Sequence, residues 1–582
     1  MTHQPAPGEL RLAGPEDDAS RADWEEAAAA VLRKAGRLSG DDPDDGVWAA
    51  LTCTTYDGVE IPPLGVPGPH GAVRPGRNGP WDVRTQNTGD NAAALHDLEN
   101  GATSLWIDTD DLAAALEGVL LDLAPVVLES GTAAHARTLL ALAADRGTTL
   151  HPATNVGVDP LAARLRGDTG IVGDEEVVEV ARLARANGIR GLVVDATVVH
   201  DEGASEAQEV GYSLAAGAAY LRLLTGAGVE LDDALAVLEF RYAATDEQLV
   251  TLAKLRAARG CWARIVALCE PASPDLAQVG AQRQHVVTSR PMLSAYDPWV
   301  NMLRGTVAAF AAGVGGADAV TVVPFDSPLG EPDDFGRRIA RNVSSLLIAE
   351  SHVAAVADPA GGSYAVEQLT DDLAEAAWAE LQRIEAAGGI LAVVDDGSLR
   401  TRIDEVVARR ERDVATRARP ITGLSEYPVL GEAVPTRAST GSTADGRDVR
   451  RWGSAFEALR ADPPEAHVFL ATLGPVARHT ARAGFAINLL AAGGIAVDVA
   501  GATDGVEALV AAYDGQSVVC VAGADAAYAA WGSEAAAGLR TAGAGRVIVV
   551  SNGAIEHSWA DDDFSPGDDA VQFLTRVREV LR

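Results

Sequence analysis

Few stretches of this sequence combine residue types and spacing that could do chemistry. It has no Gly-x-Ser-x-Gly nucleophile motif and no His-Glu-x-x-His zinc motif. Gly313–Gly316 resembles part of a phosphate loop, but it follows a helical pattern, so it is better explained as a helix C-cap. The acidic runs Asp41–Asp45 and Asp561–Asp563 predict solvated loops and no metal site.

Composition excludes several classes of function. The chain has 582 residues, enough for two or three domains, and a formal net charge of −36. That charge argues against binding to nucleic acids or anionic membranes, since both need clustered Lys and Arg. The four cysteines lie far apart without a Cys-x-x-Cys pair, which predicts reduced thiols and no disulfide frame or metal site. Without a visible signal sequence or an apolar run of membrane length, we expect a soluble cytoplasmic protein.

One stretch in the middle of the chain, from Arg338 to Tyr364, has a clear pattern. A Pro-Asp-Asp start ahead of it predicts a helix N-terminus. Apolar residues then recur at helical spacing and predict one buried face: Phe335, Ile339, Leu346, Leu347 and Val353. Pro359 predicts that the helix ends near Ala357 or Asp358, and Gly361-Gly362 predicts a tight turn.

The amino-acid sequence of this stretch, Arg338–Asn342 through Asp358–Tyr364, resembles the signature of the adenosylcobalamin-dependent acyl-CoA mutases, of which methylmalonyl-CoA mutase is the best known. The segment Thr54–Leu64 is similar to the lead-in that precedes the barrel in that family. An amphipathic helix around Trp24 to Leu32 comes before it, and the resemblance implies that this N-terminal region reaches around a partner chain.

Short apolar runs alternate with helical patterns through the first two thirds of the chain. The predicted strands are Ser104–Ile107, Val126–Leu128, Leu192–Val199, Val237–Phe240, Ile265–Leu268, Val286–Val287 and Val320–Val323. Helices are predicted at Leu112–Leu121, Ala133–Ala144, Glu175–Ala186 and Glu247–Ala258, followed by about Leu369–Ala387 and Arg402–Val414. So many strand–helix units predict a (β/α)8 TIM barrel.

A second domain follows a linker. Residues 433–449 have linker composition, and four buried strands with helices between them come after it: Val468–Leu470, Val497–Val499, Val518–Val521 and Val547–Val550. This predicts a flavodoxin-like doubly wound domain. The expected α/β organisation is an N-terminal arm and helix (1–50), a barrel (51–368), a helical segment with the linker (369–449) and the flavodoxin-like domain (450–582).

The resemblance implies a cobalamin site in the second domain, with the motif Asp-x-His-x-x-Gly. Aligned on Gly494–Val497, that motif falls on Ala477, His479 and Arg482. The histidine is kept, but the carboxylate that would orient it and the glycine that would let the backbone approach the corrin are lost. The loops at Ala522–Ala524 and Ser551–Gly553 also lack the family pattern. We therefore expect no cobalamin bound to this chain, with His479 as a hydrogen-bonded or solvent-facing side chain.

The barrel should also have lost the family's catalytic residues. The Tyr-His pair of catalytic chains falls on Thr197-Val198, and His200 is either a displaced functional histidine or a solvated one at the end of a strand. The loop between Arg74 and Trp81 is too short to carry the family's catalytic Tyr.

Other polar family positions have become apolar. The Gln-Thr-Ser run reads Val287–Ser289, and the His-Thr-Asn run reads Thr321–Val323. Trp106, Val193 and Val198 predict a barrel axis filled with bulky apolar side chains.

These losses lead to one hypothesis about function. The chain would be the small, non-catalytic chain of a heterodimeric methylmalonyl-CoA mutase, whose large partner binds adenosylcobalamin and acyl-CoA and carries all catalytic residues. One alternative is an active, divergent mutase in which His479 binds cobalt and His200 acts on the thioester. The other is a free-standing scaffold or regulatory protein.

Overall fold

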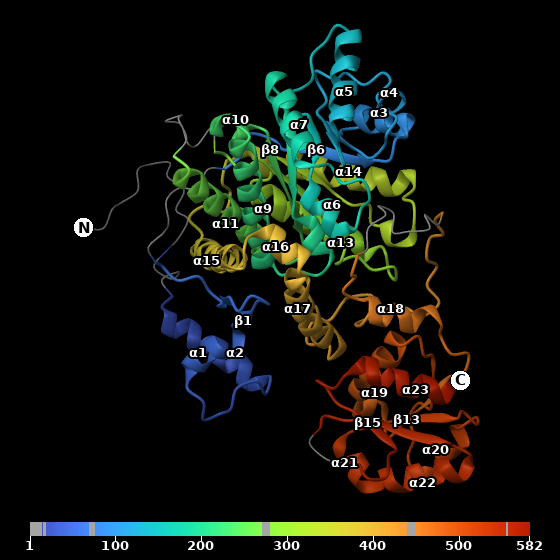
Figure 1. The fold of residues 1–582 in the computed structure, drawn as a ribbon. Coiled ribbons are helices and arrows are strands. Elements are labelled where there is room, and N and C mark those ends of the chain that lie inside the picture. The colour runs from blue at the N-terminus through green and yellow to red at the C-terminus, as the bar shows by residue number, and fades with distance from the viewer. Residues whose placement is uncertain (1–13, 15–18, 69–75, 271–279, 439–448, 554–556) are drawn as a thin grey trace.

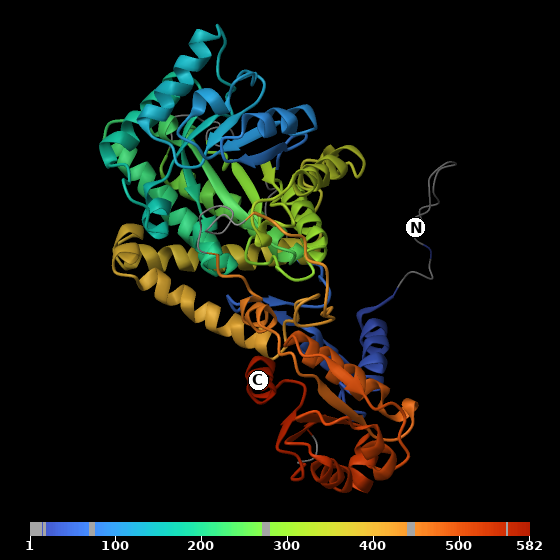
Figure 2. The same ribbon diagram turned by 90° about the vertical axis from the view of Figure 1, so that its right-hand side faces the viewer.

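The computed structural model describes residues 14, 19–68, 76–270, 280–438, 449–553 and 557–582. Figures 1 and 2 show a barrel domain and a smaller C-terminal domain, with α17 (Ser398–Ala415) running from one towards the other. None of the helices among these residues is long and apolar enough to span a membrane.

The first domain is a closed barrel of eight parallel strands. Around the barrel the order is β10-β3-β4-β5-β6-β7-β8-β9, so chain neighbours pair and β10 closes on β3. Their bounds are β3 (Asp82–Asn87), β4 (Ser104–Ile107), β5 (Val126–Leu128), β6 (Asn155–Val158), β7 (Arg190–Asp195), β8 (Leu238–Ala244), β9 (Gln284–Thr288) and β10 (Ala319–Thr321). The predicted TIM barrel is confirmed.

Helices cover the outside of the barrel. They are α3 (Asn91–Glu99), α4 (Leu112–Ala115), α5 (Ala133–Asp145), α6 (Pro160–Arg166), α7 (Asp174–Ala186), α8 (Thr197–Asp201), α9 (Glu206–Gly226), α10 (Leu231–Ala236), α11 (Gln248–Leu268), α13 (Val300–Val314) and α14 (Asp334–Ala349). Helix α15 (Tyr364–Ala386) packs over α9 and α11 as a second layer, and α16 (Ile390–Asp395) leads to α17.

Several predicted elements were wrong. Ile265–Leu268 is no strand, because it is the last turn of α11, a helix buried between the barrel and α15. The strand expected at Leu192–Val199 stops at Asp195, and α8 begins at Thr197. The helix expected at Leu112–Leu121 ends at Ala115. Polar strands β3 and β6 were missed because they lack a continuous apolar run.

The long helix of the signature stretch is also shorter than expected. Helix α14 ends at Ala349, and His352 has φ +52°, a left-handed conformation that breaks the helix well before Pro359. Phe335 and Leu346, expected on the buried face, are exposed. The expected turn is present at Gly362, where φ is +82°.

The C-terminal domain is a five-stranded parallel sheet in the order β12-β11-β13-β14-β15. The four predicted strands are confirmed as β11 (Val468–Thr472), β12 (Val497–Val499), β13 (Val518–Ala522) and β14 (Arg546–Val550). The acidic run at 561–563 lies at a fifth strand, β15 (Asp562–Phe564), so it is no loop. The helices are α18 (Ser454–Ala461), α19 (Val476–Ala492), α20 (Val506–Ala512), α21 (Asp525–Ala527), α22 (Ser533–Ala542) and α23 (Ala570–Leu581).

The N-terminal segment forms a small unit with its own core. Helices α1 (Arg21–Lys34) and α2 (Val47–Leu51) are joined by contact between Trp24 and Trp48, whose ring centroids lie 5.0 Å apart. Strands β1 (Cys53–Thr54) and β2 (Glu60–Ile61) then pair as a short ribbon before the barrel.

Candidate functional site

The axis of the barrel is filled at its middle by one aromatic ring and a set of buried charges. Trp106 of β4 is fully buried, and the guanidinium of Arg241 from β8 lies 4.2 Å from its ring centroid. Arg241 Nη1 is 2.9 Å from Asp195 Oδ2 and 3.3 Å from Glu129 Oε2. The edge of the His285 ring meets Trp106 with the centroids 5.2 Å apart. These side chains occupy the space through which a ligand arm would have to pass.

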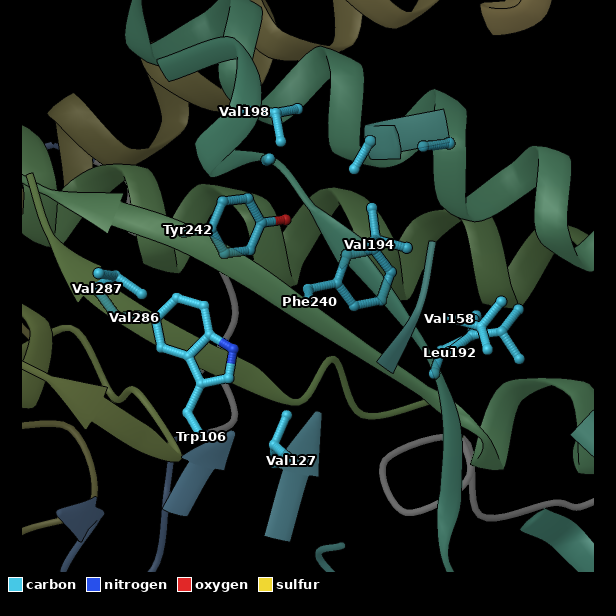
Figure 3. Close-up of a cluster of buried hydrophobic side chains, with 14 of the residues drawn as sticks. Trp106, Val127, Val158, Leu192, Val194, Val198, Phe240, Tyr242, Val286 and Val287 are labelled. Atoms are coloured by element: carbon cyan, nitrogen blue, oxygen red, sulfur yellow. The ribbon is translucent and has the colours of Figure 1, made fainter. Parts of the chain in front are cut away.

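This filling differs from the apolar one expected. Figure 3 shows Trp106, Val127 and Val287 near the axis, whereas Val198 lies above them on a helix. Val193 is buried as expected, but its neighbours across the β7–β8 pair include Glu239. The sequence contained a signal for the charges: Glu239 and Arg241 alternate with the apolar residues of β8, so they share its inner face.

A second polar layer lies nearer the amino ends of the strands. Arg84 Nη1 is 2.8 Å from Glu239 Oε1, and its Nε donates to Ser104 Oγ at 3.0 Å. His285 Nε2 lies 2.8 Å from Thr321 Oγ1. Burial, together with Arg84, Arg241 and Arg290, holds the pKa of His285 well below its ordinary value, so this histidine is neutral at pH 7.

Below this layer a cavity opens at the amino ends of the strands. Its volume is about 440 Å³, and its lining includes five arginines and three carboxylates: Arg77, Arg84, Arg190, Arg259, Arg283, Asp82, Glu239 and Asp318. Trp106 and Arg241 lie farther along the axis, Arg241 being two residues beyond Glu239 on β8. The cavity is therefore closed off from the carboxyl ends of the strands, where catalysis takes place in TIM barrels.

His200 is neither on a strand nor solvated, which corrects both expectations about its position. It is buried on α8, where Nε2 lies 2.8 Å from Ser289 Oγ and Nδ1 lies 3.6 Å from Glu209 Oε2. Lys254 Nζ is 2.6 Å from the same Glu209 oxygen. Burial lowers the pKa of His200, so the ring is neutral at pH 7.

The order serine, histidine, carboxylate is that of a hydrolase triad, but the surroundings are not. Ser289 is 1% exposed and Glu209 is fully buried, so no substrate carbonyl reaches the hydroxyl. Glu209 also accepts a hydrogen bond from Ala243 N at 2.7 Å. This cluster joins α8, α9, α11 and the ends of strands β8 and β9.

The other sequence-predicted barrel positions are also engaged within the protein. Thr288 Oγ1 accepts a hydrogen bond from Val323 N at 2.8 Å. Thr197 donates to Asp195 Oδ1 at 2.5 Å. The expected short loop begins outside the described residues at Arg74, and its end, Trp81, is buried.

In the C-terminal domain the degenerate motif lies within α19. His479 is in the second turn of this helix, is 5% exposed, and its Nδ1 lies 3.1 Å from the carbonyl oxygen of Gly474. A cobalt ligand has to present its imidazole to a macrocycle outside the domain. A side chain enclosed this far inside the domain does not fit that role.

Arg482 covers the carboxyl ends of the central strands β13 and β14, one helical turn from His479. Its Nη2 is 2.9 Å from Asp525 Oδ1 of α21, its Nη1 donates to Val550 O at 3.4 Å, and it lies 5.6 Å from the ring centroid of Tyr528. Asn552 also donates to Asp525, at 3.0 Å. These bonds close the region between the carboxyl ends of β13 and β14, next to the switch point between β11 and β13 where a flavodoxin-like domain binds its ligand. The residues present do not fit a corrin there.

No group of acidic, histidine and cysteine side chains within the described residues could hold a metal ion. The cysteines Cys53, Cys261, Cys269 and Cys520 form no disulfide with one another.

Comparison with known proteins gives the family. A family model described as methylmalonyl-CoA mutase matches residues 77–493. The "Methylmalonyl-CoA mutase small subunit" of Streptomyces virginiae is 43% identical over 99% of this chain and 98% of its own length. That of Propionibacterium freudenreichii subsp. shermanii is 34% identical over 97% of this chain and 93% of its own length. The "Methylmalonyl-CoA mutase" of Cereibacter sphaeroides is 36% identical over 40% of this chain and 33% of its own length. The chain therefore belongs to the methylmalonyl-CoA mutase family.

Proposed function

We propose that this chain is the non-catalytic small subunit of a heterodimeric methylmalonyl-CoA mutase in the cytoplasm. The large subunit would bind adenosylcobalamin and the acyl-CoA, and would interconvert (R)-methylmalonyl-CoA and succinyl-CoA. The small subunit would stabilise that partner through a pseudo-symmetric interface. Relatives that cover nearly the whole chain are named small subunits, and that name implies a larger companion.

The observation that carries the proposal is the closed axis of the barrel. Trp106, Arg241 and their carboxylate partners occupy the route that an acyl-CoA arm would need. Opening this route would break buried ion pairs, which costs several kcal/mol. The covered carboxyl ends of β13 and β14 at Arg482 support the same conclusion for cobalamin.

Two measurements test this function. The chain purified alone should leave the visible spectrum of adenosylcobalamin unchanged and should show no mutase activity with added methylmalonyl-CoA. Co-expressed with the large subunit of the same organism, it should co-elute with it in size-exclusion chromatography. A tight cobalamin complex of the isolated chain would support the divergent-mutase alternative. A failure to co-elute would support the scaffold alternative.

The role of this chain in subunit association can be measured separately from any contribution to catalysis. Activity should require the large subunit, and should be unaffected when His200 and His479 of this chain are both replaced by Gln in a folded heterodimer. A loss of kcat with unchanged subunit association would show that this chain contributes a catalytic group. Circular dichroism of the double variant provides the control for folding.

A further inference from the structure

The cavity at the amino ends of the barrel strands has no part in the proposed function. Its volume of about 440 Å³ lies within the range of small-molecule sites, about 300–1,000 Å³. Its lining carries five arginines against three carboxylates, and His285, which also lines it, is neutral at pH 7. The lining therefore has two positive charges in excess, within a chain whose net charge is −36.

Arg190, the first residue of β7, is the least satisfied of these arginines. Its guanidinium donates no hydrogen bond to the described residues, and its one ion-pair contact, from Nη1 to Glu239 Oε2, is 3.8 Å long. The other oxygen of Glu239 is held by Arg84 at 2.8 Å. The Arg190 side chain is only 16% exposed. A charged donor this far from bulk water is costly without an acceptor, so the cavity lacks an acceptor at this point.

Two further arginines of the lining have no carboxylate partner. Arg77 Nε donates to Gly79 O at 2.6 Å, and its Nη1 donates to Ala317 O at 2.7 Å. Arg259 donates to Gly315 O and to the Gln284 side chain, and its Nε is buried without a partner. Within the described part of the chain, neither arginine forms an ion pair with a carboxylate.

These contacts fix the two guanidinium groups but leave their charges uncompensated. Carbonyl and amide oxygens accept hydrogen bonds without carrying a negative charge. Burial lowers the pKa of Arg259 to about 10, so its side chain is still charged at pH 7. Arg77 and Arg259 are thus the source of the positive excess. The excess suits a ligand with two negative charges.

The arginines reach the cavity from different sides of the barrel axis. Strands β3 and β7 lie opposite each other in the closed order of eight. Arg84 belongs to β3, Arg190 begins β7, and Arg283 directly precedes β9. A tetrahedral oxyanion presents oxygens in several directions, whereas the two oxygens of a carboxylate share one plane. Guanidinium groups that converge from several sides therefore favour a phosphate group.

We propose that this cavity binds phosphate, either free or as the monoester of a small metabolite. Arg190 donates hydrogen bonds to the phosphate oxygens, and Arg77 and Arg259 balance the charge of about −2. The ligand enters from the amino ends of the strands, where Asn78 and Arg283 of the lining are exposed to solvent. This binding does not depend on the small-subunit function, so either proposal can fail without the other.

The test is isothermal titration calorimetry of the full chain with inorganic phosphate. We expect saturable binding at one site. Arg190→Gln removes the charged donor and should raise the dissociation constant by about tenfold or more. Asp82→Asn removes a negative charge from the lining and should lower the dissociation constant. Opposite effects of the two substitutions are expected for an anion site, and would not arise if these residues only stabilised the barrel.

The matched control is Arg166→Gln. The Arg166 side chain is 17% exposed, against 16% for Arg190, but it lies on α6 and pairs with Asp168 at 2.9 Å. We expect the control to change the dissociation constant less than about twofold. If circular dichroism shows that Arg190→Gln has not folded, Arg283→Gln replaces it, because Arg283 is a half-exposed residue of the same lining.

The remaining outcomes decide the ligand class. If wild type shows no saturable binding, or if Arg190→Gln and Arg166→Gln raise the dissociation constant equally, the proposal is overturned. Malonate, a small dicarboxylate, is titrated in parallel, and tighter binding of malonate than of phosphate would also overturn it. Glycerol phosphate separates the two forms of the ligand: tighter binding than phosphate supports a monoester, and weaker binding supports free phosphate.

Discussion

Ion pairs fill space in both the barrel and the C-terminal domain, but their surroundings differ. In the barrel the obstruction of the axis is a set of charges beneath the Trp106 ring, in which the buried Arg241 pairs with the buried Asp195 and with Glu129, whose side chain is 9% exposed. In the C-terminal domain a partly exposed ion pair, Arg482–Asp525, lies at the carboxyl ends of the central strands β13 and β14. The ion pairs of Arg241 are part of the barrel interior. The Arg482–Asp525 pair instead lies outside the apolar core of the C-terminal domain, to which neither residue belongs.

The largest expected effect is in the barrel. Arg241→Ala leaves two carboxylates buried without their cation, so we expect the free energy of unfolding to fall by about 3–5 kcal/mol. Urea unfolding of the isolated chain, followed by circular dichroism, measures this loss. Arg482→Ala provides the comparison. If both substitutions lower the free energy of unfolding equally, the two ion pairs do not differ in their contribution to stability.

Trp106→Ala tests the aromatic part of the same obstruction. Removing a fully buried tryptophan leaves a cavity on the axis and should cost about 3–5 kcal/mol. Trp106→Phe, which keeps most of the apolar contact, should cost less. The half-buried Trp559 of the C-terminal domain is the matched control. Equal losses at the two tryptophans would contradict the structure of the barrel interior.

The two domains should respond to pH with opposite signs. Burial raises the pKa of Asp159, which caps α6 in the barrel, to about 6, against hydrogen bonds donated by Ala162 N, Tyr220 and Asp195 N. The folded state thus holds a proton that the unfolded chain loses at lower pH. The stabilising contribution is complete below about pH 4 and is lost as the pH rises through 6, by about 2–3 kcal/mol. Asp159→Asn should remove this slope.

Asp562 of the C-terminal domain behaves the other way. Burial acts to raise its pKa, but Arg576 and Arg546 outweigh burial, so the pKa lies below its ordinary value. Its contribution to stability is present above that ordinary value and is lost as the pH falls through the lowered one. Thermal unfolding of Asp562→Asn at a series of pH values should therefore show a shallower loss in acid than wild type. If Asp562→Asn instead loses less stability than wild type at high pH, the pKa of Asp562 is raised by folding and the prediction is wrong.

The smallest effect on stability is expected for the partly exposed Arg482–Asp525 ion pair. Arg482→Ala should change the free energy of unfolding by less than about 1 kcal/mol, since the pair is partly solvated. Arg546→Ala, which removes an arginine of similar exposure (28% against 20%) from Asp562, is the control. Fluorescence-monitored unfolding of the C-terminal domain measures both. If Arg482→Ala lowers the free energy of unfolding as much as Arg241→Ala does, the Arg482–Asp525 pair contributes to stability as a core ion pair would.

The comparison also explains what the sequence could predict. The C-terminal strands were found because β11, β13 and β14 are continuous apolar runs buried on both faces. The barrel strands β3 and β6 were not, because their inner positions carry polar residues such as Arg84 and Asn155. Ile265–Leu268 was misassigned because a helix buried on two sides is as apolar as a strand.

The candidate site was predictable only in part. The replacements at Ala477 and Arg482 are visible in the sequence, whereas the partner of Arg482 is Asp525, 43 residues away. Arg241 likewise meets Glu129 and Asp195 only after the barrel has closed. The expected losses of function rest on single positions. Which side chains fill the barrel axis and cover the C-terminal sheet depends on contacts between residues far apart in the sequence. The spacing of residues within one segment does not reveal such contacts.

The ion pairs around Arg241 also limit how this barrel can change. Substituting the arginine alone leaves two acids in the interior without their cation, and substituting either acid alone removes one of the two ion pairs of the buried Arg241. Each single step towards a hollow axis therefore passes through a less stable protein than the present one. A descendant of this chain with an open ligand channel would have to alter at least three interior positions together: Arg241, Asp195 and Glu129.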